Sequence, residues 1–530
     1  MSASVLKHPW WIAFSSLGNS ARYLDEWLIV ELSYTIRQKP EWERKYKDPT
    51  ILAKWKSEFL ASNPKTKHPE EVFDYAAEEL KWYEELQAQV GRGFQFGPDD
   101  KILYSDGAVS EKDEKDFADL ASKFEYAIIE KDYHPGSDDL VVDLVHPSLY
   151  HLVYNRTKIL NNGKLETAQF EEAIKAVKKG VADYGVSKKF QWLPALMKLD
   201  DEKQFTFGSY INNLHPLKNA ELYGSIAKIF NSAVPAINMS LARYQSKEYV
   251  RIPTADFGEY YTEGYDKYEE KLEDLIDEGA DEEEFEAWEK GKRAYYREFK
   301  PKYDNAPKTK PFELRDLESL KVIVKLANIE LTPEKPEYKG GSWHVEGTIN
   351  EDIVATVLYY YDMDNIEESR LSFKYAFEDP HYDQGDECYC EDFYGIKNED
   401  KMTRVIGNVV AQKGRITVFT NSFQHHVDAF KLKDATKPGY RKILCFFLVD
   451  PYNTEVKATD VVPFQNEKWA NDRVLMEKFF PGIDAKDLAT MTEKEAKDYR
   501  DELIAERKVI IEDDEDYENA YTRTFFLCEH

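Results

Sequence analysis

The sequence predicts an α+β protein in which a helical N-terminal region packs on a C-terminal β sandwich or jelly roll. The first third of the chain carries apolar residues at helical spacing, whereas the chain after residue 317 carries short apolar runs separated by glycines and acidic turns. The 530 residues are 42% hydrophobic and 14% aromatic. That content is ample for a globular core and argues against wholesale disorder.

The N-terminal region is expected to span residues 1–236 and to be mainly helical. Aliphatic residues recur every fourth position from Leu24 to Ile36, with charged residues between them, which is typical of an amphipathic helix. Pro40 should end this helix. Further expected elements are a helix over 69–89, a strand over 204–210 and a helix over 218–236.

Two segments flank the expected β core. Residues 237–316 form an acidic helical insert with a linker rich in lysine and proline at 300–311. We expect the acidic stretch, 259–290, to be a solvated surface decoration without a cation-binding role. Residues 466–530 should form a C-terminal helical extension, with a helix over 493–507.

The β core is expected at residues 317–465. Several short strands with turn signals between them are typical of a sandwich or jelly roll. The candidate strands are 322–326, 353–361, 370–377, 405–410, 415–420 and 442–449.

Charge and cysteine content restrict the partners and the compartment. The chain has 71 basic and 100 acidic residues, a net charge of −29, so nucleic acid and anionic membranes are not expected partners. The apolar run 10–14 is too short to span a membrane. With only four cysteines, a cytoplasmic location is expected. Cys388-x-Cys390 lacks a second pair and is a weak metal-site candidate.

One short motif carries the chemistry. In an extended chain, residues two positions apart point to the same face, so His344 and Glu346 could bind one metal together. A third ligand must come from elsewhere, and His425, in a Gln-His-His-Val run, follows a candidate strand 79 residues after Glu346. Two histidines and one carboxylate leave coordination positions open, which suits Fe(II) oxygen chemistry.

An oxygenase of this type also needs a cation for the distal carboxylate of 2-oxoglutarate. Arginine suits this role because its planar guanidinium binds a carboxylate in a bidentate manner. Arg441 lies 16 residues after His425 and opens an apolar strand. It is therefore the predicted anchor, with Arg370 and Arg415 as the next candidates.

A second His-x-acid pair competes with the first. His381 and Asp383 have the commoner His-x-Asp form, but they lie in a segment rich in Asp, Glu, Pro and Gly, with no strand directly after them. We interpret this segment as an exposed loop, because a loop would lose entropy on ordering around a metal.

Several long motifs resemble a fungal family known as domain of unknown function 4246. Residues 322–362, VIVKLANIELTPEKPEYKGGSWHVEGTINEDIVATVLYYYD, look like the core of that family. Other matching stretches are PEWERKYKDPTILAKW, YHPGSDDLVVDLVHPSLYHLVYNRT, SKKFQWLP, SYINNLHP, GYRKILCFFLVDP and the closing LCEH. The resemblance covers most of the chain.

The family is similar to 2-oxoglutarate/Fe(II) oxygenases in its C-terminal part, which implies a double-stranded β-helix there. It also implies iron ligation at His344, Glu346 and His425 and co-substrate anchoring at Arg441. Two departures matter. Most such oxygenases have Asp where this chain has Glu346, and the family has Arg where this chain has His426, which could compete with His425.

The resulting functional prediction is an Fe(II)/2-oxoglutarate-dependent dioxygenase that hydroxylates an unidentified small molecule or side chain. Glu346 fills the position that a halogenase leaves open for halide, so hydroxylation is favoured. Two alternatives stay open: a non-catalytic jelly-roll scaffold or binding protein, and a zinc-dependent hydrolase, since two His and one Glu also suit Zn(II). The oligomeric state is not predicted.

Overall fold

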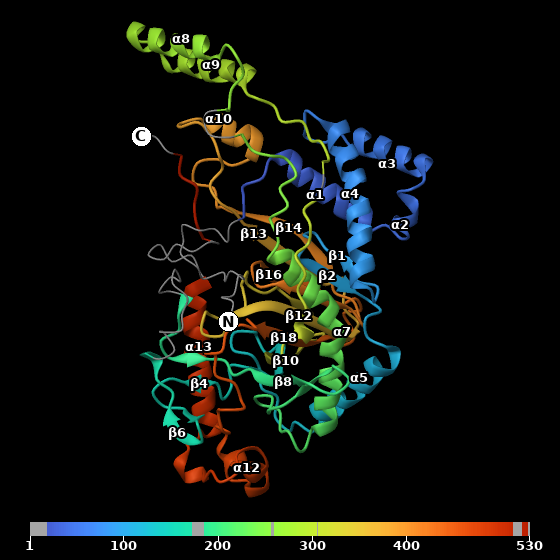
Figure 1. Cartoon of the computed structure of the whole chain (residues 1–530), viewed down its shortest axis with the longest axis vertical. Helices are drawn as coiled ribbons and strands as arrows, with labels where there is room; N and C mark the ends of the chain where they lie inside the picture. Colours follow the sequence, from blue (N-terminus) through green and yellow to red (C-terminus); the bar gives the residue numbers. More distant parts are fainter. Residues whose placement is uncertain (1–18, 172–184, 256–258, 305, 512–521, 528–530) are drawn as a thin grey trace.

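The computed structural model describes residues 19–171, 185–255, 259–304, 306–511 and 522–527, and it combines helices with antiparallel sheets (Figure 1). The helices are α1 Leu24–Arg37, α2 Trp42–Lys45, α3 Pro49–Ala61, α4 Pro69–Val90, α5 Glu111–Tyr126, α7 Ala220–Tyr244, α8 Tyr265–Glu278, α9 Glu282–Lys292, α10 Glu387–Tyr389, α11 Glu467–Ala470, α12 Arg473–Phe479 and α13 Glu493–Ile511. None of the helices in these ranges is long and apolar enough to cross a membrane.

The strands before residue 317 are short. They are β1 Gln95–Phe96, β2 Ile102–Ser105, β3 Val141–Val145, β4 Leu152–Val153, β5 Lys158–Asn161, β6 Lys164–Thr167, β7 Phe190–Gln191, β8 Ala195–Leu199 and β9 Phe205–Phe207. The later strands are β10 Ser319–Leu331, β11 Glu337–Tyr338, β12 Ile353–Asp364, β13 Arg370–Ala376, β14 Thr403–Val410, β15 Ile416–Thr420, β16 Gln424–Val427, β17 Phe430–Lys431 and β18 Gly439–Val449.

The expected helices are present with small changes at their ends. The helix that begins at Leu24 stops before Pro40, and the second helix begins at Pro69, at the first helical position that proline tolerates. The helix expected over 218–236 continues through Pro235 to Tyr244 as α7. All six candidate strands of the β core correspond to observed strands.

A nine-stranded sheet forms the centre of the molecule. Its strand order is β1-β2-β15-β12-β18-β10-β8-β9, and β3 pairs with β10 off this path. Strands β1, β2, β3, β8 and β9 come from the region before residue 237, so the sheet combines strands from both sides of the boundaries predicted at residues 236 and 316.

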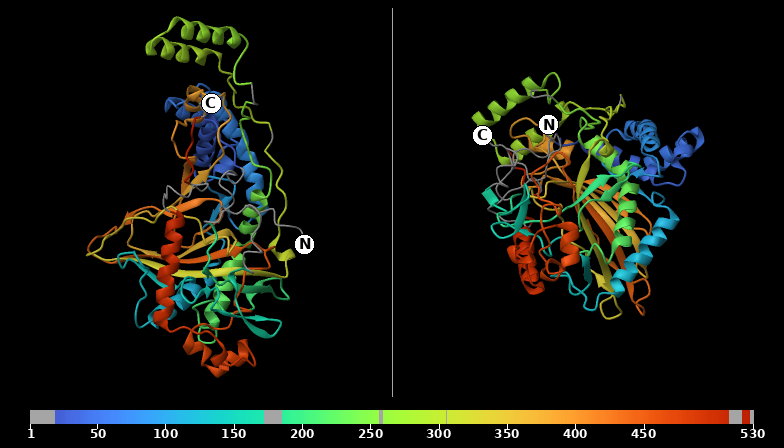
Figure 2. Two further views of the ribbon diagram at one scale, coloured as in Figure 1. Left: turned by 90° about the vertical axis from the view of Figure 1, so that its left-hand side faces the viewer. Right: turned by 60° about the horizontal axis from the view of Figure 1, so that its bottom comes forward.

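The sheet separates two hydrophobic cores because side chains alternate between its faces. On β18, Phe446 and Leu448 pack into the core beneath α5 and α7, whereas Cys445 and Phe447 point into the opposite core. Figure 2 shows α7 running along one side of the sheet. Burying each large apolar side chain contributes about 1.5–3 kcal/mol to the free energy of unfolding, so packing holds β18 in place from both faces.

A smaller sheet covers the second core. Its order is β14-β13-β16, and β11 pairs with β17 just beside it. The Phe373 ring of β13 meets the Phe419 ring of β15 at 5.1 Å between centroids, so the small sheet faces the large one. The inner face of the large sheet, as we call the side toward β13, carries the candidate site.

The acidic insert is a two-helix hairpin that projects away from the body (Figure 1). Helices α8 and α9 join at Gly279, which adopts a left-handed conformation with φ 72°. The Tyr268 and Trp288 rings stack within the hairpin. At its base, Lys292 forms an ion pair of 3.1 Å with Asp386, which is 1% exposed and also accepts hydrogen bonds from two tyrosine hydroxyls.

We predict that replacing residues 269–288 with a short Gly-Ser link leaves the melting temperature of the body essentially unchanged, because the hairpin packs on itself. Asp386→Ala, by contrast, removes the partner of a buried lysine and should cost about 3 kcal/mol. Differential scanning calorimetry of both variants provides the comparison. A melting temperature that falls as far in the deletion as in Asp386→Ala would contradict the prediction.

Candidate metal centre

The candidate site is built on one backbone pair. His344 and His425 lie opposite each other and exchange two hydrogen bonds: the His344 N–H donates to the His425 carbonyl at 3.1 Å, and the His425 N–H donates back at 2.9 Å. Gly340 precedes this pair with φ +97°, and a Cβ atom there would lie 3.0 Å from the Val427 carbonyl oxygen. Glycine is therefore needed for the close approach.

Asn421 fixes the third member of the site. Its side-chain oxygen accepts from the Glu346 N–H at 2.8 Å, and its side-chain amide donates to the Glu346 carbonyl at 2.8 Å. The same amide donates to the carbonyl of Ile353 at 3.1 Å. The Asn421 side chain thus makes the hydrogen bonds to the Glu346 backbone that a neighbouring strand would otherwise make. Because Asn421 is 1% exposed, these bonds are protected from water.

These two constraints bring His344, Glu346 and His425 together. The Glu346 Oε1 atom lies 3.7 Å from His344 Nε2 and 3.5 Å from His425 Nε2, and one potential ligand atom from each residue lies within 4.8 Å of the others. His344 Nδ1 lies 2.8 Å from the carbonyl of Ser342. That acceptor places the ring proton on Nδ1 and leaves Nε2 free to bind a metal.

The electrostatics suit a cation at this point. Burial raises the pKa of Glu346, but the hydrogen bonds from His344 and His425 lower it more, so the carboxyl is ionised well below its ordinary range. Burial, followed by the charge of His344, lowers the pKa of His425. An ionised carboxylate and a neutral imidazole are the forms that bind metals.

The neighbouring histidine points elsewhere. His426 stacks on Trp343, with ring centroids 4.0 Å apart, and its Nε2 lies 3.0 Å from an Asp428 carboxylate oxygen. Adjacent residues of a strand face opposite sides, so only His425 reaches Glu346.

The competing His-x-Asp pair lies in a loop, as expected. Residues 379–386 contain neither helix nor strand. His381 and Asp383 belong to neither of the two groups of potential metal ligands found among the described residues.

Arg441 is a buried cation with little compensation. It is 2% exposed, and its Nη1 donates to the Ser369 hydroxyl at 2.8 Å. The rings of Tyr360 and Phe430 lie 5.6 and 5.5 Å from the guanidinium carbon. Its buried Nε has no hydrogen-bond partner, and no carboxylate of the described ranges lies within ion-pair distance. A buried guanidinium of this kind is costly without an anion.

The other arginine candidates are already paired. Arg370 is largely exposed and binds Glu368. Arg415 binds both carboxylate oxygens of Asp106, at 2.6 and 2.8 Å. Neither has a free guanidinium to offer a ligand, so Arg441 is the best anchor of the three.

A second group of potential ligands consists of His134, Asp143 and His146. His134 Nδ1 lies 2.9 Å from Asp143 Oδ2, and the Ser148 N–H donates to His146 Nδ1 at 3.2 Å. Burial lowers the pKa of His146 to about 3, so its ring is neutral and carries its proton on Nε2. A metal at Nε2 would have to displace that proton and break the Ser148 bond.

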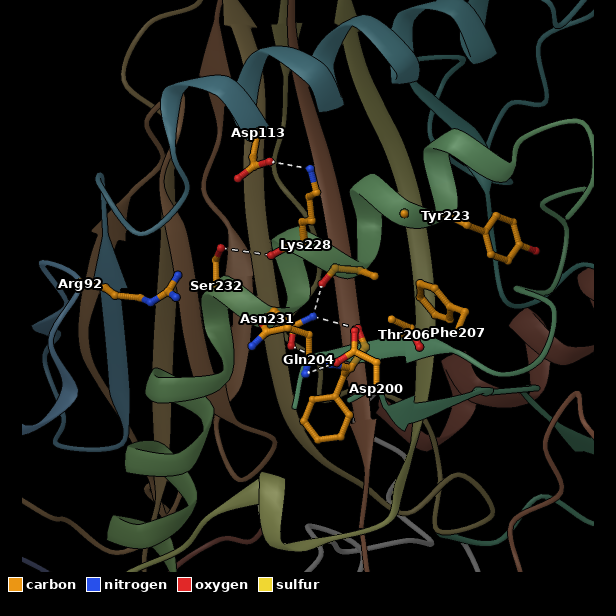
Figure 3. Close-up of a pocket in the computed structure, with 13 residues that line it drawn as sticks. Arg92, Asp113, Asp200, Gln204, Thr206, Phe207, Tyr223, Lys228, Asn231 and Ser232 are labelled. Carbon is orange, nitrogen blue, oxygen red and sulfur yellow. Dashed lines mark hydrogen bonds and ion pairs between the residues drawn. The ribbon is translucent and has the colours of Figure 1, made fainter. Parts of the chain in front are cut away.

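A surface pocket of about 620 Å³ lies away from these groups, between α5, α7 and β9 (Figure 3). Its polar side chains are already paired: Lys228 binds Asp113 at 3.1 Å, and Asn231 bonds to the backbone of Phe205. Neither group of potential metal ligands lines it, so its shape alone does not make it a site of chemistry.

Three supporting residues were not predicted from the sequence. Asn421 and Ser369, which bond to Glu346 and Arg441, and the half-buried Lys325 on the inner face are ordinary residue types at unremarkable spacings, and only the folded chain brings them into these positions. Lys325 alone gave a signal, as a charge within the apolar run VIVKLA.

The chain belongs to the family described as "Protein of unknown function (DUF4246)", whose model matches residues 70–473. The N-terminal domain of the same family matches residues 1–58. A comparison with curated proteins gives no match.

Comparison with solved structures finds weak likenesses. A bsmA homolog from Methylobium petroleophilum has a TM-score of 0.26 and 9% identity over 69% of this chain and 92% of that chain. The Fe(II)/α-ketoglutarate-dependent dioxygenase TqaL has a TM-score of 0.22 and 8% identity, covering 64% and 90%. IDO from Bacillus thuringiensis has a TM-score of 0.15 and 13% identity, covering 24% and 45%. At such TM-scores a likeness does not establish a common fold.

We predict that His344→Ala, Glu346→Ala and His425→Ala each abolish stoichiometric Fe(II) binding, because two remaining ligands cannot hold the ion. The matched controls, His381→Ala, Asp383→Ala and His426→Ala, should bind Fe(II) like the wild type. Anaerobic titration with metal analysis of the desalted protein gives the stoichiometry. Full occupancy in His344→Ala together with loss in His381→Ala would reverse the assignment.

Asn421→Ala should weaken Fe(II) binding about 10- to 100-fold, the usual effect of removing a group that orients a ligand. The variant keeps all three ligands but frees the backbone of Glu346. Asn453 provides the control as Asn453→Ala, because its side chain also accepts from a backbone N–H, that of Glu455 at 2.9 Å, but outside the metal group. Equal Fe(II) affinities in the two variants would show that Asn421 does not position Glu346.

Proposed function

We propose that the protein is a non-haem Fe(II)/2-oxoglutarate-dependent oxygenase. The observation that carries the proposal is a two-His, one-carboxylate group facing the inner face of the large sheet, where Arg441 lies unpaired; the His425 ring lies 4.8 Å from that of Phe419 on β15. In the β10–β18 register Arg441 lies opposite Ile329, and Cys445, on the same face, lies opposite Lys325. The charges of Glu346 and Arg441 both act on this face. Burial raises the pKa of the Cys445 thiol, the charge of Glu346 raises it further and the charge of Arg441 lowers it.

The strand order supports a double-stranded β-helix as the core of this enzyme. Counted in chain order from β10, with β16 and β17 as one strand, eight strands form two sheets. Their orders are 1-8-3-6 in the large sheet and 2-7-4-5 in the small one. Apart from strands 4 and 5, which are neighbours in the small sheet, successive strands alternate between two facing sheets, which is the arrangement of a jelly roll.

The residues fit the metal and the co-substrate. His344, Glu346 and His425 would hold Fe(II) on one side and leave coordination positions for ligands. Arg441 and the Ser369 hydroxyl would bind the distal carboxylate of 2-oxoglutarate, which supplies the missing anion. When bound, Fe(II) and 2-oxoglutarate supply oxidative decarboxylation coupled to substrate oxidation. The aromatic rings around Arg441 would exclude water and strengthen the ion pair with the bound carboxylate.

The two alternatives explain less of the structure. A non-catalytic scaffold would account for the fold but not for a buried arginine without a partner. A zinc hydrolase would need a general base beside the metal. Among the described residues no fourth histidine or carboxylate joins the His344 group as a candidate base. Asp143 belongs to the separate group with His134 and His146.

Anaerobic titration of the protein with Fe(II) and 2-oxoglutarate tests the proposal directly. We expect one Fe(II) per chain and a metal-to-ligand charge-transfer absorption band that requires both additions. Tight Zn(II) binding without such a band would support the hydrolase, and absence of both would support the scaffold.

Arg441→Met should weaken 2-oxoglutarate binding about 10- to 100-fold while leaving Fe(II) content unchanged, because one charge-assisted ion pair is lost. Methionine fills a similar volume and removes a costly buried charge, so the fold should survive. Arg415→Met, which breaks an existing ion pair, is the control. An unchanged 2-oxoglutarate affinity in Arg441→Met would mean that another cation is the anchor.

A further inference from the structure

Lys325 is placed on the inner face by strand register. In the β10–β18 ladder Lys325 lies opposite Cys445, while Arg441 lies opposite Ile329 four residues along β10. Residues two or four apart on a strand share a face, so both cations face the side that holds the metal group. Four residues of strand separate them by about 13 Å at the backbone.

The lysine has no partner of its own. No hydrogen bond or ion pair to its ammonium is found in the described part of the chain, and the flanking inner-face residues, Ile323 and Ala327, are apolar and buried. Lys325 nevertheless keeps some surface accessible to solvent. A cation held in an apolar strand but still reachable is suited to a ligand.

The charge of Lys325 acts on both groups of potential metal ligands. Burial lowers its pKa, but Asp143, the Cys445 thiol and Glu346 raise it more, so the side chain is a stable cation. In the ladder with β3, Asp143 lies opposite Ala327, two residues from Lys325, so Asp143 and Lys325 share the inner face. In the described part of the chain Asp143 and Glu346 lie within ion-pair distance of histidines, and neither forms an ion pair with Lys325.

The charges of both cations affect the Tyr338 hydroxyl. Burial raises the pKa of its hydroxyl, and the charges of Arg441 and Lys325 both lower it. The hydroxyl thus lies within the field of both groups. Arg441 has a serine hydroxyl and two aromatic rings around it, whereas Lys325 has only carboxylates at longer range.

We propose that Lys325 forms a second anion site on the inner face of the large sheet, the face toward the His344 group, and binds a carboxylate there. This inference rests on the proposed function and refines it. An ammonium is a compact charge with three donors, which suits a single carboxylate group. That carboxylate belongs either to the 2-oxo acid, at the end near the metal, or to the oxidised substrate.

The same observations disfavour a second metal ion at His134, Asp143 and His146. Lys325 shares the inner face with Asp143, which lies opposite Ala327, and its charge would repel a metal there. His146 also has its Nδ1 engaged by the Ser148 N–H. Asp143 instead serves as the distant counter-charge that keeps Lys325 charged before its ligand arrives.

The test compares Lys325→Met with wild type in three anaerobic titrations. The ligands are 2-oxoglutarate, pyruvate (a 2-oxo acid without a distal carboxylate) and acetate added to the protein loaded with Fe(II) and 2-oxoglutarate. The first two are followed by absorption and the third by thermal shift. Lys442→Met is the matched control, because Lys442 lies on the opposite face of β18 and binds Glu125.

Loss of about 10- to 100-fold in the affinity for both 2-oxoglutarate and pyruvate, with partial rescue in Lys325→Arg, would assign the site to the co-substrate. Loss of the acetate effect alone would assign it to the substrate. Unchanged affinities in all three titrations would overturn the proposal.

Failure of the proposed function is distinguishable from failure of this site. If wild-type protein binds neither Fe(II) nor 2-oxoglutarate, the acetate titration is run on the metal-free chain. A thermal shift that disappears in Lys325→Met but persists in Lys442→Met would still support the anion site. No difference between these two variants would refute it.

Discussion

The pair of backbone hydrogen bonds between His344 and His425 is the constraint on which the site depends. It joins the segment after Gly340 to β16, and β16 pairs in turn with β13, where Phe373 lies opposite His425. Any shift of register by one residue would turn both imidazoles away from Glu346. The tight packing of Gly340 against the β16–β17 connection prevents such a shift.

The second determinant is the distribution of charge across the inner face of the large sheet. Most arginines of the described chain with buried side chains have carboxylate partners, as Arg243 does with Asp100 at 2.7 Å. Arg441 and Lys325 lack such partners and face the same side as Glu346. Under the proposed function these two cations would favour small anionic ligands, although the whole chain carries a charge of −29. Net charge is therefore a poor guide to what a local site binds.

Much of the fold was predictable because its long elements carry periodic patterns. The amphipathic helix from Leu24 and the six core strands follow directly from apolar spacing. The short strands β1 to β9 were largely missed, since two to five residues are too few for a period to show. Their pairing depends on partners far along the chain: β3, for example, pairs with β10 through Asn328 and Val142.

The sequence by itself determined which residue types could form the site: the His-x-Glu pair on an extended segment, the distant histidine and the arginine that opens a strand. Only the tertiary structure decided that His425 rather than His426 faces Glu346, that Arg415 is already paired, that Asn421 bonds to the Glu346 backbone and that Lys325 lies on the inner face. The physical reason is that ligand geometry and charge pairing depend on contacts between strands distant in sequence. A linear pattern records which face a side chain takes, but not what lies opposite it.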